Sequence, residues 1–207
     1  YPAPEAILRG ETKEHEQGGK QNMKDAKSLV LLGLITALLI IFSFTPIGTI
    51  PVGPLSITLN IIPIAIAAVA LGPTGGAVIG GIFGFLSFLQ CLGIGIPSGM
   101  GAVLFSINPF LAFVQRFVPR LLDGWLVGQI FRVCDKRLGH GPAGFITGFC
   151  SAFLNTLFFM TALILLFGNT EYVQGLIGGR NVIVFVCAFV GVNAVVEMLG
   201  STVVTDR

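Results

Sequence analysis

LSITLNIIPIAIAAVALGPTGGAVIGGIFGFLSFL, residues Leu55 to Leu89, contains no charged side chain and decides the fold of this chain. It lies inside a longer stretch, Ser28 to Gln115, in which 88 consecutive residues include no Lys, Arg, Asp or Glu. Soluble domains carry about 25% charged residues because their surface faces water, whereas this chain carries 11%. The pattern therefore indicates an integral membrane protein.

The charges separate a tail from a membrane domain. Residues 1–26 are polar, mixed in charge and without the apolar core of a signal peptide. We expect them to form a disordered tail, native or added, outside the fold. Residues 27–207 then form one transmembrane domain, with room for about six spanning helices of about 20 residues each. Its unbroken apolar runs do not alternate in polarity, as the strands of a membrane β-barrel would.

Apolar runs bounded by glycine and proline predict an all-α fold with six transmembrane helices. The expected ranges are about 27–44, 57–71, 75–92, 109–132, 143–167 and 181–203. Gly72-Pro73 separates the second helix from the third. Gly76, Gly80 and Gly84 follow at intervals of four, which places a flat stripe on one helix face for close backbone packing.

Two uncharged connections rich in glycine and proline follow the first and third expected helices. They are PIGTIPVGPLS (residues 46–56) and CLGIGIPSGMGAVLFSINP (residues 91–109). Lys and Arg residues outside the helices favour both termini in the cytoplasm, which puts both connections on the outer face. Irregular backbone at membrane depth must be buried in protein or line a cavity. We therefore expect two ordered loops that close over a pocket.

The inventory of reactive residues argues against an enzyme. The two histidines, His15 and His140, lie in the tail and in a cytoplasmic connection, so no membrane-embedded Ser/His pair or His-ligated metal site is available. No motif supports a catalytic pair of Asp123 and Glu197, and no P-loop is present. We expect no catalytic residue, cofactor, metal or nucleic-acid partner, and any ATP-driven step requires a partner protein.

The fourth expected helix carries the ionisable residues of interest. Gln115, Arg116, Arg120 and Asp123 occur within about three turns, and we expect Arg120 to meet Asp123 or Glu197. Arg116 lies about 10 Å below the outer end of this helix, with no acid at its depth. Two interpretations stay open. Arg116 binds a carboxylate or phosphate of a ligand through two parallel hydrogen bonds, or it reaches the surface or the carbonyls of a loop.

Neutral polar side chains can complete such a pocket, although each alone is as often found between packed helices. The candidates for substrate binding besides Arg116 are amide and hydroxyl side chains: Gln115, Asn60, Asn155, Thr161 and Asn193. On the first expected helix, Gly33 and Ala37 form a small-xxx-small pair. This pair allows close approach of another helix, either within the protein or from a partner.

The Leu55 to Leu89 block and NPFLAFVQRFVPR (Asn108 to Arg120) resemble the substrate-binding S component of energy-coupling factor (ECF) transporters, which take up vitamins in bacteria and archaea. The block combines a Thr-Leu-x-x-x-Pro start, a Leu-Gly-Pro turn and a Gly-rich helix that closes on Gly-Phe-Leu-Ser. The resemblance covers about Leu29 to Val203. The Arg-bearing fourth helix is most similar to that of the pantothenate-specific members.

This resemblance implies a vitamin pocket formed by helices four to six in the bacterial plasma membrane. Arg116 would hold the carboxylate of pantothenate, and the amides would bind its other polar groups. The resemblance implies that the two outer loops gate the pocket through these residues: Ile50, Pro51, Val52, Gly53, Ser98, Gly99 and Met100. Another vitamin, such as pyridoxine, hydroxymethylpyrimidine or folate, is the alternative within the family. Outside it, the alternative is a self-sufficient carrier or channel for small solutes.

The resemblance also implies partners. Helices one to three would face a transmembrane coupling protein, the T component, which is driven by two cytoplasmic ATPases. Gly33 and Ala37 are the nearest match to the Ala-x-x-x-Ala pattern that many members carry on the first helix, so we expect the coupling protein to dock there. The remaining contacts of the chain would be with membrane lipid and the vitamin.

Overall fold

A computed structural model of the chain describes residues 26–45, 48–52, 55–96, 98–179 and 191. The chain divides into two compact units, residues 1–34 and 35–207, and the fold is described here for the second. The expected sixth helix, residues 181–203, lies outside the described residues, and so do Asn193, Glu197 and Gly53.

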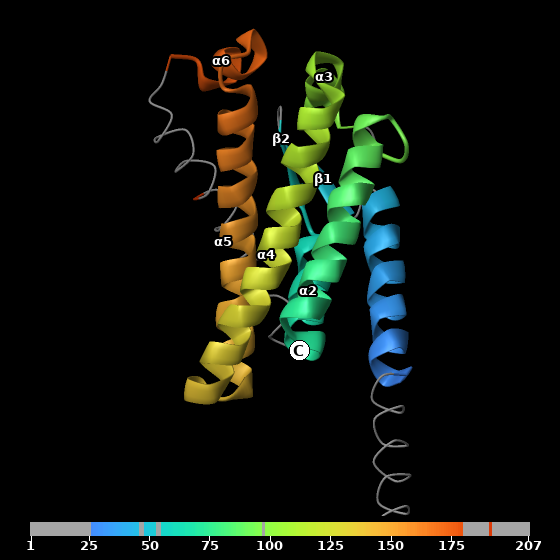
Figure 1. The fold of residues 1–207 in the computed structure, drawn as a ribbon, viewed down its shortest axis with the longest axis vertical. Coiled ribbons are helices and arrows are strands. Elements are labelled where there is room, and N and C mark those ends of the chain that lie inside the picture. The colour runs from blue at the N-terminus through green and yellow to red at the C-terminus, as the bar shows by residue number, and fades with distance from the viewer. Residues whose placement is uncertain (1–25, 46–47, 53–54, 97, 180–190, 192–207) are drawn as a thin grey trace, which may run out of the picture. The chain divides into compact units, whose positions relative to one another are not determined.

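The described elements are helices apart from one short hairpin (Figure 1). After the helix Ala26–Phe44 they are β1 (Thr49–Val52), β2 (Leu55–Thr58), α2 (Ile61–Cys91), α3 (Gly99–Ile107), α4 (Pro109–Leu138), α5 (His140–Phe167) and α6 (Glu171–Ile177). Ala26–Phe44, α2 and α5 are long and apolar enough to cross a membrane. A helical membrane protein is thus confirmed, while the count of six spans and their orientation stay predictions.

Helix α2 consists of two segments joined by a sharp break. Gly72 has φ 75° and ψ −167° inside the helix, a conformation that glycine adopts readily, and Pro73 follows it. The chain reverses direction at this point, because a Cβ placed on Gly76 would lie only 3.1 Å from the Cβ of Ala68. The predicted separation of two helices at Gly72-Pro73 is therefore confirmed.

The first of these segments begins later than the sequence predicts. β1 pairs antiparallel with β2, with Thr49 opposite Thr58 and Val52 opposite Leu55. Residues 57 and 58 thus belong to a strand, and the predicted helix start at residue 57 is wrong. Backbone groups at membrane depth need partners, and the hairpin supplies them. The helix from Ile61 to the break is about 16 Å long, roughly half the thickness of the hydrocarbon layer.

The connection after α2 is ordered and contains α3. Gly93 and Gly95 turn the chain with φ 81° and 89°, which favours glycine. Ser98 caps the N-terminus of α3 by accepting a hydrogen bond from the backbone N–H of Gly101 at 3.2 Å. Asn108 caps α4 in the same way, with Pro109 at the first helical position.

The glycine stripe of α2 lies directly against the backbone of α4. A Cβ placed on Gly80 would meet the carbonyl oxygen of Arg120, and one on Gly84 would lie 2.8 Å from the Cα of Phe117. The predicted close packing is confirmed, and its partner is the helix that carries the arginines. α4 in turn lies between α2 and α5 (Figure 1).

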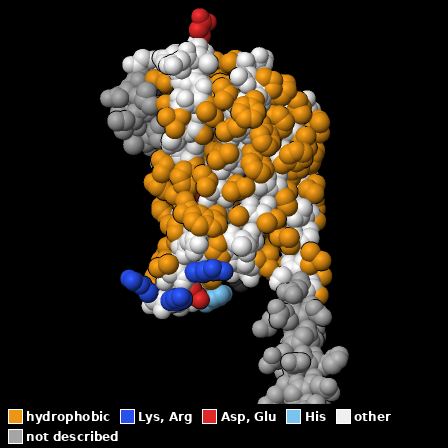
Figure 2. Space-filling view, in the orientation of Figure 1, with side chains coloured by type: hydrophobic (Ala, Val, Ile, Leu, Met, Phe, Trp, Pro, Cys, Tyr) orange, Lys and Arg blue, Asp and Glu red, His pale blue; other side chains and the backbone are white. Residues whose placement is uncertain are grey.

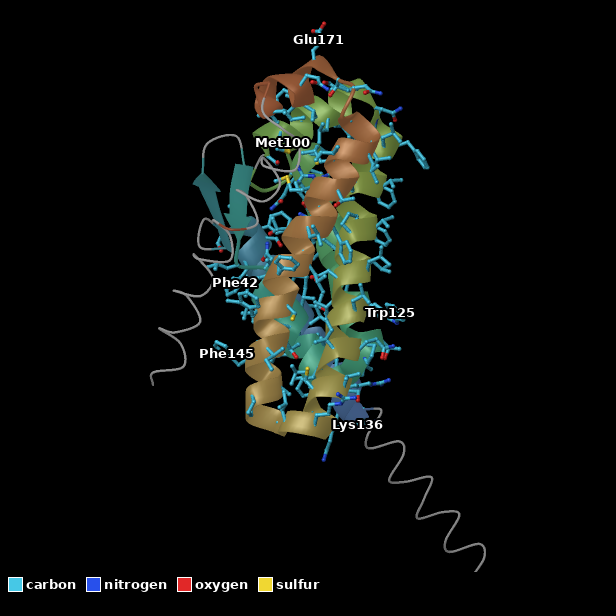
Figure 3. The ribbon with its side chains drawn as sticks, turned by 90° about the vertical axis from the view of Figure 1, so that its left-hand side faces the viewer. Phe42, Met100, Trp125, Lys136, Phe145 and Glu171 are labelled. Atoms are coloured by element: carbon cyan, nitrogen blue, oxygen red, sulfur yellow. The ribbon has the colours of Figure 1, made fainter. Side chains whose placement is uncertain are left out.

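On the face that Figure 2 shows, charged side chains lie at the two ends of this unit, with a broad apolar surface between them. Lys136 lies near one end and Glu171 at the other (Figure 3). The apolar surface matches what lipid tails would contact. An excess of Lys and Arg marks the cytoplasmic side of membrane proteins, so the assignment of the Lys136 end to the cytoplasm stays a prediction.

Substitution of one stripe glycine tests the contact between α2 and α4. Gly80→Ala should lower the free energy of unfolding by about 1–3 kcal/mol, because its methyl group meets backbone atoms that cannot rotate away. The matched control is Gly81→Ala, whose Cβ would lie at an ordinary 3.6 Å from the ring of Phe117. Thermal unfolding in detergent measures both variants, and equal stability of the two would contradict the packing described here.

Candidate substrate-binding site

Arg116 is buried on α4 and is held by hydroxyl groups from two other segments. Its side chain is 6% exposed. Nη1 donates a hydrogen bond to Oγ of Ser87 on α2 at 3.3 Å, and Nη2 donates to Oγ of Ser98, the cap of α3, at 3.1 Å. Neither acceptor carries a charge, so these contacts leave the positive charge of the guanidinium uncompensated.

Arg120 lies one turn further along α4 and is held differently. Its Nη1 donates to the carbonyl oxygen of Arg116 at 2.8 Å, and its guanidinium lies 4.4 Å from the ring centre of Phe83. The ring of Phe159 on α5 lies within reach of both arginines, at 5.2 Å from Arg116 and 5.4 Å from Arg120. Aromatic faces stabilise a desolvated cation by about 2 kcal/mol.

The burial and hydrogen bonds of Arg116 test the interpretation that its side chain reaches the surface or the carbonyls of a loop. The side chain is buried, so the prediction that it reaches the surface is wrong. It does contact a loop residue, but through the hydroxyl of Ser98 and not through carbonyls. Among the described residues, no carboxylate accepts a hydrogen bond from Arg116. The expected contact of Arg120 with Asp123 or Glu197 stays a prediction, since Asp123 is buried about one turn away on α4 and Glu197 lies outside the described part of the chain.

Several buried amides accompany the arginines. Gln115 is 0% exposed, and both polar atoms of its side chain lack a hydrogen-bond partner in the described part of the chain. Oδ1 of Asn155, on α5 one turn before Phe159, is likewise buried and unpartnered. A buried polar atom without a partner costs about 1–3 kcal/mol. Such atoms are suited to hydrogen bonds with a polar ligand.

Asn60 precedes α2 and is almost fully buried. An asparagine at this position ordinarily accepts a hydrogen bond from the first turn of the helix, yet here its side chain makes no such bond, and both of its polar atoms are unpartnered. The register of the reversal at Gly72 places Asn60 level with Gly84, whose Cβ would lie 3.0 Å from the carbonyl oxygen of Arg116. Asn60 is therefore near the depth of the arginines.

Thr161 differs from the other predicted site residues that the structure describes. It is exposed on α5, while Asn155 and Met160 on the same helix are buried. Six residues separate it from Asn155, which turns it about 120° around the helix axis. It does not belong to the buried polar set.

Two short helices, α3 and α6, cover the end of the unit near this site. Met100 lies near this end, and Glu171 marks its tip (Figure 3). The buried side chains of one apolar cluster, here called the cap cluster, come from α3 to α6: Met100, Leu104, Ala112, Met160, Leu163, Phe167, Val173 and Ile177. Of the predicted gating residues, Ile50, Pro51 and Val52 lie in β1, and Met100 belongs to the cap cluster.

Sequence reasoning missed Ser87 and α6. Ser87 follows Gly84 by three residues and so continues the glycine stripe that faces α4, a signal that was present in the sequence. Helix α6 is capped at its start by Thr170, whose hydroxyl accepts from the N–H of Val173, and is followed by Gly178 with φ 59°. These are the usual start and stop signals of a helix, but the segment is only seven residues long.

Comparison with known proteins places this chain in a family. Residues 27–206 match the family described as ECF transporter, substrate-specific component. The chain belongs to this family. It is 29% identical over 183 residues to the pantothenate transporter PanT of Leuconostoc mesenteroides subsp. mesenteroides, covering 84% of this chain and 85% of the relative. The pantothenic acid transporter PanT of Lactococcus lactis subsp. cremoris is 26% identical over 174 residues, covering 75% of this chain and 84% of the relative.

This family match confirms the resemblance seen in the sequence. It identifies the chain as the substrate-specific component of a transporter, which is not an enzyme. Its apolar helices agree with a protein of the membrane. The residues of the site come from the chain itself, and their roles are the subject of the proposals below.

The unpartnered amide of Gln115 should be dispensable for folding. Gln115→Met preserves the size of the side chain, removes a buried amide without a partner, and should leave the free energy of unfolding unchanged or raise it by about 1 kcal/mol. Gln90→Met is the control, because Nε2 of Gln90 donates to the carbonyl of Ser43 at 2.8 Å and its loss should be destabilising. Thermal unfolding without ligand measures both. A larger loss for Gln115→Met than for Gln90→Met would contradict the assignment.

Proposed function

We propose that this chain is the vitamin-binding subunit of an ECF importer in the bacterial plasma membrane and that it binds pantothenate. The observation that carries the proposal is the buried guanidinium of Arg116, whose described hydrogen-bond partners are two neutral hydroxyls. An arginine offers five N–H donors, and these two hydrogen bonds, which join described residues, occupy one donor on each terminal nitrogen. A carboxylate accepts from two such donors in parallel.

The other groups of pantothenate match the neutral part of the site. The molecule has one carboxylate, one amide, two hydroxyls and a branched apolar centre. Gln115, Asn155 and Asn60 supply buried amides for its amide and hydroxyl groups. The ring of Phe159 supplies an apolar surface beside Arg116. Asn193 stays in the proposed set from the sequence alone.

The two relatives support this choice of vitamin over the alternatives. Both are described as transporters of pantothenate or pantothenic acid, and each shares more than a quarter of its aligned residues with this chain. Pyridoxine and hydroxymethylpyrimidine lack a carboxylate, so they would offer the guanidinium of Arg116 no opposite charge, and its hydrogen-bond acceptors among the described residues are neutral hydroxyls. The site therefore favours an acidic vitamin.

Removal of the guanidinium tests the proposed ligand. Arg116→Ala should raise the dissociation constant for pantothenate about 10- to 100-fold, the loss expected for hydrogen bonds to a charged group. Arg132→Ala is the matched control, because Arg132 is exposed on the same helix and should bind as the wild type does. Calorimetry on protein in lipid nanodiscs measures both. Unchanged affinity in Arg116→Ala, or no binding by the wild type while another vitamin binds, would contradict the assignment.

We propose further that a coupling protein and two ATPases drive transport. The small-residue pair of the first helix supports a docking surface, because both Gly33 and Ala37 are exposed and a Cβ on Gly33 would have no neighbour within 4 Å. Small exposed residues allow the backbone of a partner helix to approach this helix closely.

Reconstitution tests this assembly. The chain alone in liposomes should bind pantothenate without accumulating it, and accumulation should require the partner proteins and ATP. Gly33→Leu should slow uptake by the complex at least several-fold, with an unchanged dissociation constant, because a bulky side chain keeps the partner helix at a distance. Gly148→Leu on α5, where a Cβ likewise meets nothing within 4 Å, is the control. Uptake by the chain alone would instead indicate a self-sufficient carrier.

A further inference from the structure

The guanidinium of Arg116 is fixed by contacts that leave its charge available. Ser87 and Ser98 each accept from a different terminal nitrogen, at 3.3 Å and 3.1 Å. Two such contacts fix both the position and the plane of a rigid, planar group. An acidic residue in either place would also fix it, but would compete with an anionic ligand for the same donors.

Neither the hydroxyl of Ser87 nor that of Ser98 is required for the stability of the helix to which it belongs. Ser87 lies in the interior of α2 and is 2% exposed; helix interiors favour alanine over serine there. Ser98 caps α3, and its oxygen accepts both from the N–H of Gly101 and from Arg116. Glycine caps a helix nearly as well as serine does, so capping alone does not require the hydroxyl.

Gly101, together with Ser87 and Ser98, forms the binding position of the Arg116 guanidinium, here called its seat. A Cβ on this residue would lie 2.9 Å from Nη2 of Arg116 and 2.6 Å from Sγ of Cys91. Any larger side chain would therefore displace the guanidinium or the thiol. The seat is formed by two segments, α2 and the start of α3, that are brought to α4 by separate contacts.

We infer that Ser87 and Ser98 are positioning residues that hold the Arg116 guanidinium for the carboxylate of the ligand and so set the preference for an acid over a neutral analogue. This inference rests on the proposed function, because it concerns the same site. The hydroxyls act through Arg116. Their loss lets the guanidinium move away from the geometry in which two parallel hydrogen bonds form.

The test compares pantothenate with pantothenol, in which a hydroxymethyl group replaces the carboxylate. Calorimetry in nanodiscs gives the ratio of the two dissociation constants for Ser87→Ala and Ser98→Gly. Each variant should reduce the preference for the acid about 5- to 10-fold, with little change in the affinity for the alcohol. Ser87→Thr, which keeps a hydroxyl at this position, should retain the preference that Ser87→Ala loses.

The control is Ser106→Ala, whose hydroxyl donates only within α3, to the carbonyl of Val103. It should keep the wild-type ratio, and thermal unfolding verifies that each variant is folded. Parallel weakening of both ligands, or an unchanged ratio in both serine variants, would overturn the inference while leaving pantothenate binding intact. A wild type that binds neither ligand would instead overturn the proposed function.

Discussion

Backbone contact between α2 and α4 is the constraint on which the rest of the structure depends. The carbonyl of Gly124 on α4 occupies the space that a Cβ on Gly76 would need, and Gly76 excludes a Cβ on Gly124 in return. In a bilayer, burial of apolar surface gives little force for helix association, so close packing at small residues supplies it. The same contact continues to Arg120 and Arg116, and therefore fixes the depth and direction of both cations.

Burial of two cations at membrane depth is costly, and the structure offsets the cost without removing their charge. Phe83 and Phe159 present aromatic faces to the guanidinium groups, while Arg120 is bonded to a backbone carbonyl. Ionisable residues inside membranes are expensive and usually functional. Unpartnered amides such as that of Gln115 add to the cost. A protein that holds polar groups ready in this way gives up stability in exchange for binding.

Sequence reasoning predicted the parts of this arrangement that rest on local chemistry. The break at Gly72, the glycine stripe and the position of Arg116 about two turns into α4 follow from covalent geometry and helix periodicity. The β1–β2 hairpin was missed, since strands of only four residues are too short for periodicity to distinguish from the start of an apolar helix. The hydrogen bonds of Arg116 with Ser87 and Ser98 join residues far apart in the sequence. A single sequence does not reveal which distant residues are in contact.

The central claim is that the guanidinium of Arg116 directly binds the carboxylate of the vitamin. Solid-state NMR dephasing between carboxyl-13C pantothenate and protein labelled with 15Nη-arginine measures this contact in lipid bilayers. The account predicts strong dephasing, at the short distance that two parallel hydrogen bonds impose. This signal should persist in Arg120→Lys and disappear in Arg116→Lys. Dephasing that survives in Arg116→Lys, or its absence from the saturated wild type, would contradict the account.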